Sequence, residues 1–100
     1  MKPPVFRPAA VRDLDRIWTW TADRWGVARA ERYLRAIRAT CTALATGERS
    51  GTDASEIRSS YRKARAGRHV LFYRLQPDGT VEVVRILHER MDVPSRLRES

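Results

Sequence analysis

One hundred residues, 42% of them hydrophobic, can build one modest core, which argues against a second domain and against a large internal active-site cavity. The 20 lysines and arginines outnumber the 12 acidic residues and give a formal net charge of +8, which favours an acidic partner, either a protein or a nucleic acid. A single cysteine, Cys41, excludes an internal disulfide framework, and no long apolar run indicates secretion or membrane insertion. We therefore expect one cytoplasmic domain over residues 1–100.

The first half of the chain predicts two helices joined by a tight connection. The apolar stripe of the first helix, residues 8–25, comprises Val11, Leu14, Ile17, Trp18, Thr21 and Trp25. Pro8 is favourable in the first turn of a helix, and Gly26 is expected to end this helix. The stripe of the second helix, from residue 27 to about 46, comprises Val27, Ala30, Leu34, Ile37, Cys41 and Leu44. Because the connection is short, the helices must run antiparallel and pack stripe against stripe.

The second half predicts strands. After a short extended start at residues 4–7 and a polar loop at 46–55, three antiparallel strands are expected at 57–64, 68–75 and 81–87. Residues 76–79 form a strong hairpin turn between the last two. The strands at 68–75 and 81–87 are too apolar for either face of the sheet to be fully exposed to solvent. We therefore expect the helical hairpin to cover one face. The predicted fold class is α+β, an N-terminal helical hairpin packed on a small antiparallel sheet, with a short terminal helix near Pro94.

Cations concentrate between residues 57 and 74, where no acid occurs. They are Arg58, Arg62, Lys63, Arg65, Arg68 and Arg74. Alternate residues of a strand share a face, so Arg58 and Arg62 would lie on one side of the first strand, with Lys63 and Arg65 on the other. We interpret the stretch as a docking site for carboxylates or phosphates, since protecting an edge strand from aggregation rarely needs so many cations.

The polar residues after the last strand could form a general acid–base cluster, since His88, Glu89 and Arg90 are consecutive. Neighbouring residues of an extended chain point in opposite directions, so structural or partner contacts are the stronger interpretation. His69 lies inside an apolar strand and is expected to be a packing residue. With only one cysteine and two histidines, no metal or cofactor site is expected.

The three tryptophans lie on the first helix. Trp18 and Trp25 are seven residues apart on the core stripe and are expected to be buried. Trp20 lies off that stripe, and it is a candidate for an exposed partner contact.

Four segments, in this order, resemble toxins of the ParE branch of the RelE/ParE superfamily. They are residues 9–18 (AAVRDLDRIW), 33–37 (YLRAI), 68–74 (RHVLFYR) and 81–92 (VEVVRILHERMD). The resemblance extends over about residues 4–97 and implies the RelE/ParE fold. RelE-like members cleave mRNA in the ribosome, whereas ParE-like members poison DNA gyrase.

Two departures favour the gyrase-poisoning branch. RelE-like cleavage usually needs a C-terminal tyrosine or histidine, and none follows Arg90. Val70 stands where RelE-like toxins place an active-site arginine, although Arg90 could match their second basic position. The resemblance therefore implies a toxin with no catalytic residues; an mRNA endoribonuclease and a basic nucleic-acid-binding module remain alternatives.

The resemblance also implies a ParD-like antitoxin whose disordered, acidic C-terminal segment folds on the toxin. The expected antitoxin-binding residues are Arg58, Arg62, Arg65, Arg68, Arg74 and Trp20. The expected target-binding residues are His88, Glu89, Arg90 and Met91. We expect no direct nucleic-acid binding and no membrane contact.

Overall fold

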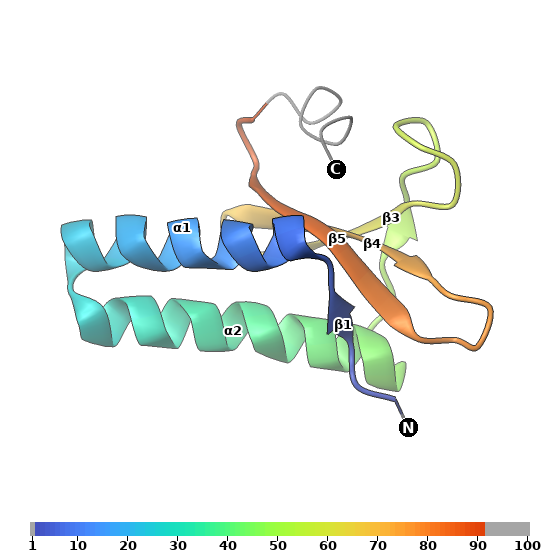
Figure 1. The fold of residues 1–100 in the computed structure, drawn as a ribbon, viewed down its shortest axis with the longest axis horizontal. Helices are drawn as coiled ribbons and strands as arrows, with labels where there is room; N and C mark the ends of the chain where they lie inside the picture. The colour runs from blue at the N-terminus through green and yellow to red at the C-terminus, as the bar shows by residue number, and fades with distance from the viewer. Residues whose placement is uncertain (1, 92–100) are drawn as a thin grey trace.

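Two antiparallel helices form the first half of the chain, as predicted (Figure 1). The computed structural model describes residues 2–91, so the helix expected near Pro94 lies outside the described residues. Helix α1 spans Pro8–Trp25 and helix α2 spans Val27–Thr46. Gly26 joins them with a φ of 91°, which glycine adopts without strain. Its N–H donates to Ala22 and its carbonyl accepts from Ala30, so a single residue ends one helix and begins the next. Neither helix has the length and apolar character that crossing a bilayer requires.

The strands form one five-stranded sheet in the order β1-β5-β4-β3-β2. Their bounds are β1 Val5–Phe6, β2 Thr52–Asp53, β3 Arg62–Ala66, β4 His69–Leu75 and β5 Val81–His88. The predicted antiparallel meander is confirmed in β3, β4 and β5. The hairpin turn is confirmed by the Gly79 N–H, which donates to Gln76 O at 2.8 Å. The parallel pairing of β1 with β5 and the short edge strand β2 were not predicted.

The start of the first predicted strand was wrong, because residues 57–60 lie in turns and a bend, and β3 begins at Arg62. In this segment the Ile57 N–H donates to Ala54 O, and the Tyr61 N–H donates to Arg58 O. These turns place apolar side chains over the sheet face that the helices leave open. Arg58 therefore does not share a strand with Arg62, whereas Lys63 and Arg65 do share one face of β3, as predicted.

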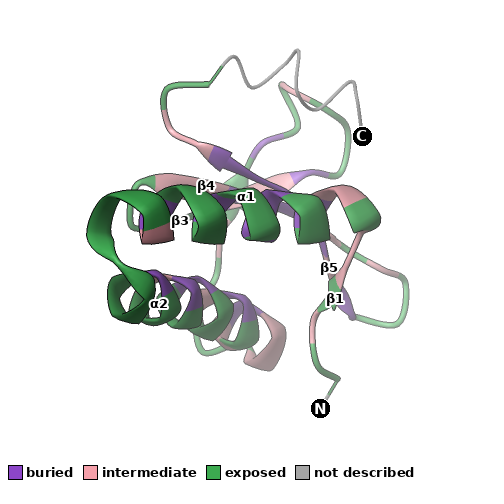
Figure 2. Cartoon of the chain, turned by 60° about the vertical axis from the view of Figure 1, so that its left-hand side comes forward, coloured by how far each residue is buried: buried purple, intermediate pink, exposed green. Residues whose placement is uncertain are grey.

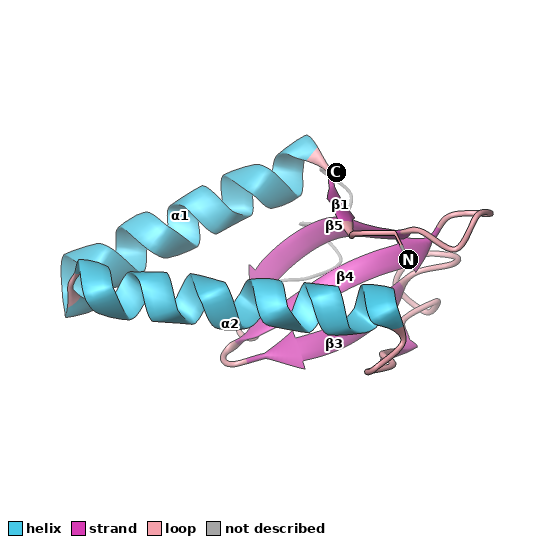
Figure 3. Ribbon diagram, turned by 90° about the horizontal axis from the view of Figure 1, so that it is seen from below, coloured by secondary structure: helices cyan, strands magenta, loops and turns pink. Residues whose placement is uncertain are grey.

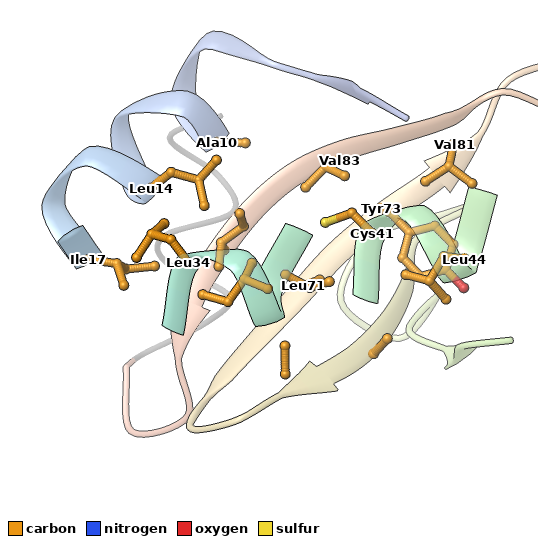
Figure 4. Close-up of a cluster of buried hydrophobic side chains, with 14 residues drawn as sticks. Ala10, Leu14, Ile17, Leu34, Cys41, Leu44, Leu71, Tyr73, Val81 and Val83 are labelled. Atoms are coloured by element: carbon orange, nitrogen blue, oxygen red, sulfur yellow. The ribbon is translucent and has the colours of Figure 1, made fainter. Parts of the chain in front are cut away.

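The larger core lies between the helical hairpin and one face of the sheet (Figure 3). Figure 4 shows side chains from both helices pointing toward those of β4 and β5. The labelled members are Ala10, Leu14, Ile17, Leu34, Cys41, Leu44, Leu71, Tyr73, Val81 and Val83. A smaller cluster on the other face comprises Ala54, Tyr61, Phe72, Val84 and Leu87. The prediction that the hairpin covers one face is confirmed.

The predicted core stripe of α1 was wrong in part: Leu14, Ile17 and Thr21 are buried as predicted, but the three other members are not. Trp18 is 37% exposed and Trp25 is 57% exposed, and Val11 at the other end is exposed too. Ala10 and Asp13 lie on the buried face instead, because Asp13 binds β5 and sets the rotation of the helix. The hairpin tip also extends past the strand ends, so Trp25 and Val27 have no sheet beneath them (Figure 3). Figure 2 shows the outer surfaces of both helices as exposed.

Candidate functional site

A cleft lies between the C-terminal half of α1 and the strand ends where β4 begins and β5 finishes. It consists of two adjoining hollows of about 440 and 320 Å³, a size typical of binding clefts. Trp20, His69 and His88 line both hollows. We call this surface the tryptophan cleft. Its further lining residues are Arg16, Ile17, Thr21, Trp25, Arg29, Tyr33, Arg68, Arg90 and Met91.

The floor of the tryptophan cleft is a row of three rings. His69 and His88 are paired in register across β4 and β5, with ring centroids 5.4 Å apart at 90°. Tyr33 of α2 meets His69 edge-on at 5.6 Å, and its hydroxyl lies 2.7 Å from His69 Nδ1. The Arg68 N–H donates to the same hydroxyl at 3.0 Å. These contacts confirm His69 as a packing residue with a hydrogen-bond partner.

Burial holds His69 in its neutral form. Desolvation, with the neighbouring His88 as the second cause, lowers the pKa of His69 from 6.5 to about 4. Near neutral pH its Nδ1 can therefore accept the hydroxyl hydrogen of Tyr33. His69 thus adds little positive charge to the floor of the cleft.

The walls combine aromatic rings with arginines. Trp20 is 56% exposed, with the Arg24 guanidinium 4.7 Å from its ring centroid. The Arg29 guanidinium likewise stacks on Trp25, 4.5 Å from the centroid of its ring. Such stacking leaves the other ring face free for a partner while keeping a cation beside it. The prediction that Trp20 is exposed is confirmed.

The six predicted antitoxin-binding residues do not form one surface. Trp20 and Arg68 both line the tryptophan cleft. Arg74, by contrast, donates to Glu82 of β5, and Arg62 donates to Gly51 O at 2.8 Å. These two arginines therefore support the sheet and the loop before it.

The remaining two predicted arginines lie elsewhere. Arg58 sits in the turns over the open face, 5.9 Å from the ring of Tyr61. Arg65 projects from β3 and forms an ion pair with Glu89. It also lines a shallow hollow beside β2, which we call the basic groove; the cations of this groove are Arg49, Lys63 and Arg65.

Three of the four predicted target-binding residues line the tryptophan cleft, and Glu89 does not. His88, Arg90 and Met91 line the tryptophan cleft. Glu89 lies away from it, between Arg65 and Arg68, and the hydrogen bond from Arg65 lowers the pKa of its carboxyl group. Adjacent residues thus point apart, as expected for an extended chain.

Seven cleft residues were not predicted as site residues, namely Arg16, Ile17, Thr21, Trp25, Arg29, Tyr33 and His69. One sequence signal could have identified two of them. Trp20 and Arg24 are four residues apart within α1, a spacing that brings two side chains together on one helix face. Trp25 and Arg29 have the same spacing across Gly26, and their side chains stack as well. Tyr33 gave no such signal because its partners His69 and Arg68 are distant in sequence.

No group of three metal-ligating side chains occurs within residues 2–91. Cys41 is buried in the core, where desolvation raises the pKa of its thiol to about 11. At neutral pH this side chain is therefore an uncharged packing group.

Comparisons with known proteins agree with the fold and with one another. Residues 5–93 match the family described as "ParE toxin of type II toxin-antitoxin system, parDE". The chain is 50% identical to Toxin ParE1 of Mycobacterium tuberculosis over 93% of this chain and 95% of that protein. It is 38% identical to Toxin ParE1 of Caulobacter vibrioides, over 97% of this chain and 99% of the relative.

A solved structure titled "Chromosomal ParDE TA system from P. aeruginosa" has the same fold. Its chain superimposes with a TM-score of 0.74 at 16% identity, over 88% of this chain and 96% of its own. With the identities above, the chain belongs to the ParE family of toxins of type II toxin–antitoxin systems.

Proposed function

We propose that this toxin acts in the cytoplasm by binding DNA gyrase, without catalysis, and that a ParD-like antitoxin neutralises it. The observation that carries the proposal is the tryptophan cleft. It brings Trp20 and Arg68, which were expected to bind the antitoxin, onto the same surface as His88, Arg90 and Met91, which were expected to bind the target. One exposed surface therefore serves both partners.

The side-chain arrangement favours binding over acid–base chemistry. A general acid–base pair needs its two groups within reach of one substrate. The Glu89 carboxylate is instead engaged by Arg65 and Arg68, outside the hollows that His88 lines. His88 Nδ1 accepts from the Arg90 N–H at 3.2 Å. The cluster at the end of β5 therefore supports a role in recognition.

Charge supports an acidic antitoxin segment. Within residues 2–91, the lining of the two hollows includes four arginines and no acidic side chain; the arginines are Arg16, Arg29, Arg68 and Arg90. Complementary charge steers the encounter, while an apolar contact on Trp20 would slow dissociation. The solved relative's title names a ParDE system, which is consistent with such a pair.

The test is a gyrase supercoiling assay run beside a ribosomal translation assay that monitors mRNA integrity. We expect the purified toxin to inhibit supercoiling and to leave mRNA intact, and we expect the product of the neighbouring gene to restore supercoiling. Cleavage of mRNA on ribosomes would establish the endoribonuclease alternative. Salt-dependent binding to RNA or DNA, without an effect on gyrase, would establish the nucleic-acid-binding alternative.

A further inference from the structure

Two cationic surfaces meet at Glu89. On the helix side of the β3–β4 turn, Arg29 and Arg68 belong to the tryptophan cleft. On the other side, Lys63 and Arg65 point from β3 into the basic groove. Glu89 contacts the guanidinium groups of both Arg65 and Arg68, the latter at 3.6 Å. The cations therefore form a continuous series around the turn.

We propose that one acidic segment of the antitoxin wraps around the β3–β4 turn, from the tryptophan cleft to the basic groove. This inference rests on the proposed function, because it assigns a path to the antitoxin. We call the path the cationic track; its residues, in order, are Arg29, Arg68, Arg65, Lys63 and Arg49.

Glu89 indicates which chemistry the track recognises. Its carboxylate already occupies the position between Arg65 and Arg68, so the chain itself shows a carboxylate bound there. Arg65 and Arg68 remain 61% and 73% exposed, which leaves donors free for further acidic groups. Arginine presents five N–H donors in a planar fork, so it can hold one carboxylate and receive another.

The rest of the track supports the same occupant. Lys63 and Arg65 lie two residues apart on one face of β3, about 7 Å along the strand, which is also the spacing of alternate side chains in an extended peptide. Arg49 donates to the Arg65 carbonyl at 2.8 Å, which fixes it beside the groove. Among the described residues, none that lines the basic groove is acidic. Acidic side chains at alternate positions of an extended segment would match this end of the track.

The hollow between the two helices also contains arginines, but it does not suit an acidic segment. The depression between α1 and α2, which we call the mixed-charge hollow, is lined by Trp18 and by four charged residues, namely Asp15, Glu31, Arg35 and Arg38. Two arginines share this hollow with two acidic residues, so it offers an acidic segment no net attraction. Cationic charge is widespread on this protein; along the cationic track, Glu89 is the one acidic partner found within residues 2–91.

The experiment measures fluorescence anisotropy of a labelled peptide on the full-length toxin at low salt. The probe has about 15 residues, with glutamates alternating with serines and one central leucine, and it spans about 50 Å when extended. A second peptide carries glutamine at every glutamate position. We expect the glutamate peptide to bind and the glutamine peptide not to bind.

Three double variants of the toxin, each with the same change in net charge, locate the binding path. Arg29→Glu/Arg68→Glu alters the cleft end, and Arg49→Glu/Lys63→Glu alters the groove end. Arg12→Glu/Arg32→Glu is the control, at exposed positions that line neither surface. We expect each track variant to weaken binding at least about tenfold relative to the control variant. Lys63→Glu alone should weaken it about threefold, and it leaves the hydrogen bond of Arg49 intact.

Equal weakening by all three double variants would mean that the peptide senses only net charge, and would overturn the track. Weakening at the cleft end alone would overturn it too. In both cases gyrase inhibition and its reversal by the antitoxin could still hold, so failure of the path is distinguishable from failure of the proposed function. Circular dichroism of each variant shows that the fold is retained.

Discussion

Asp13 and Arg85 form a bidentate ion pair in the buried space between α1 and β5. Arg85 Nε and Nη2 donate to the two carboxylate oxygens at 2.8 and 2.9 Å, and the Ile86 N–H donates to Asp13 Oδ2 at 2.9 Å. The pair lies directly beneath the tryptophan cleft, where Asp13 and Arg85 share a small hollow with His69 and His88. It therefore fixes the rotation of α1, and with it the position of Trp20.

Removing this carboxylate should destabilise the protein strongly. In Asp13→Ala the Arg85 guanidinium stays buried without its carboxylate, so we expect a loss of about 3–5 kcal/mol in the free energy of unfolding. Asp15→Ala, on the exposed face of the same helix, should change it by less than about 0.5 kcal/mol. Urea denaturation of both variants measures the difference, and equal midpoints would contradict the structural role.

The neutral His69 predicts a pH dependence. Its pKa is about 4 in the fold and 6.5 in the unfolded chain, so the unfolded chain binds the extra proton as pH falls. The stabilisation is complete above about pH 6.5 and is lost progressively toward pH 4. Between pH 7.5 and 5 we expect the free energy of unfolding to fall by about 1–2 kcal/mol, since the partial exposure of His69 screens part of the effect.

His69→Gln provides the control for this pH dependence, because its side-chain carbonyl can still accept from Tyr33. Glu82 and Glu89 titrate below the chosen range, since arginine partners lower the pKa of both carboxyl groups; for Glu82, Arg74 and Arg7 outweigh the opposing effect of burial. The variant should therefore show a flatter curve between pH 7.5 and 5. An unchanged slope would assign the effect to another group.

Local sequence patterns predicted most of the fold because local chemistry determines it. Pro8 and Gly26 bound α1 in the sequence as they do in the structure, and the turn at residues 76–79 pairs β4 with β5. The rotation of α1 could not be read in this way. Trp18 and Asp13 compete for the buried face, and the choice depends on Arg85, which is far away in the sequence.

The candidate site could be predicted only in part for the same reason. Trp20 and Arg68 were identified by exposure and charge, but only the antiparallel register of β4 and β5 brings His69 and His88 side by side beneath them. Arg58 and Arg62 were grouped because a strand was expected to contain both. The turns over residues 54–61 separate them.

Trp20 should be a main energetic contact for either partner. Tryptophans in the centre of an interface commonly contribute more than about 2 kcal/mol, so Trp20→Ala should weaken antitoxin binding about 30-fold or more. It should also reduce gyrase inhibition. Trp18→Ala is the matched control, since Trp18 lines the mixed-charge hollow on the same helix. Isothermal titration with the antitoxin compares the two, and equal losses would remove the tryptophan cleft as the binding surface.

Glu89 should oppose the binding of acidic partners. In Glu89→Gln the carboxylate between Arg65 and Arg68 becomes neutral, so we expect the glutamate peptide to bind about threefold more tightly at low salt, with the gain disappearing at high salt. Glu31→Gln changes the net charge equally in the mixed-charge hollow and should have no such effect. If Glu89→Gln instead weakens binding, the carboxylate positions the two arginines for the partner, and the partner's acids bind beside Glu89 without replacing it.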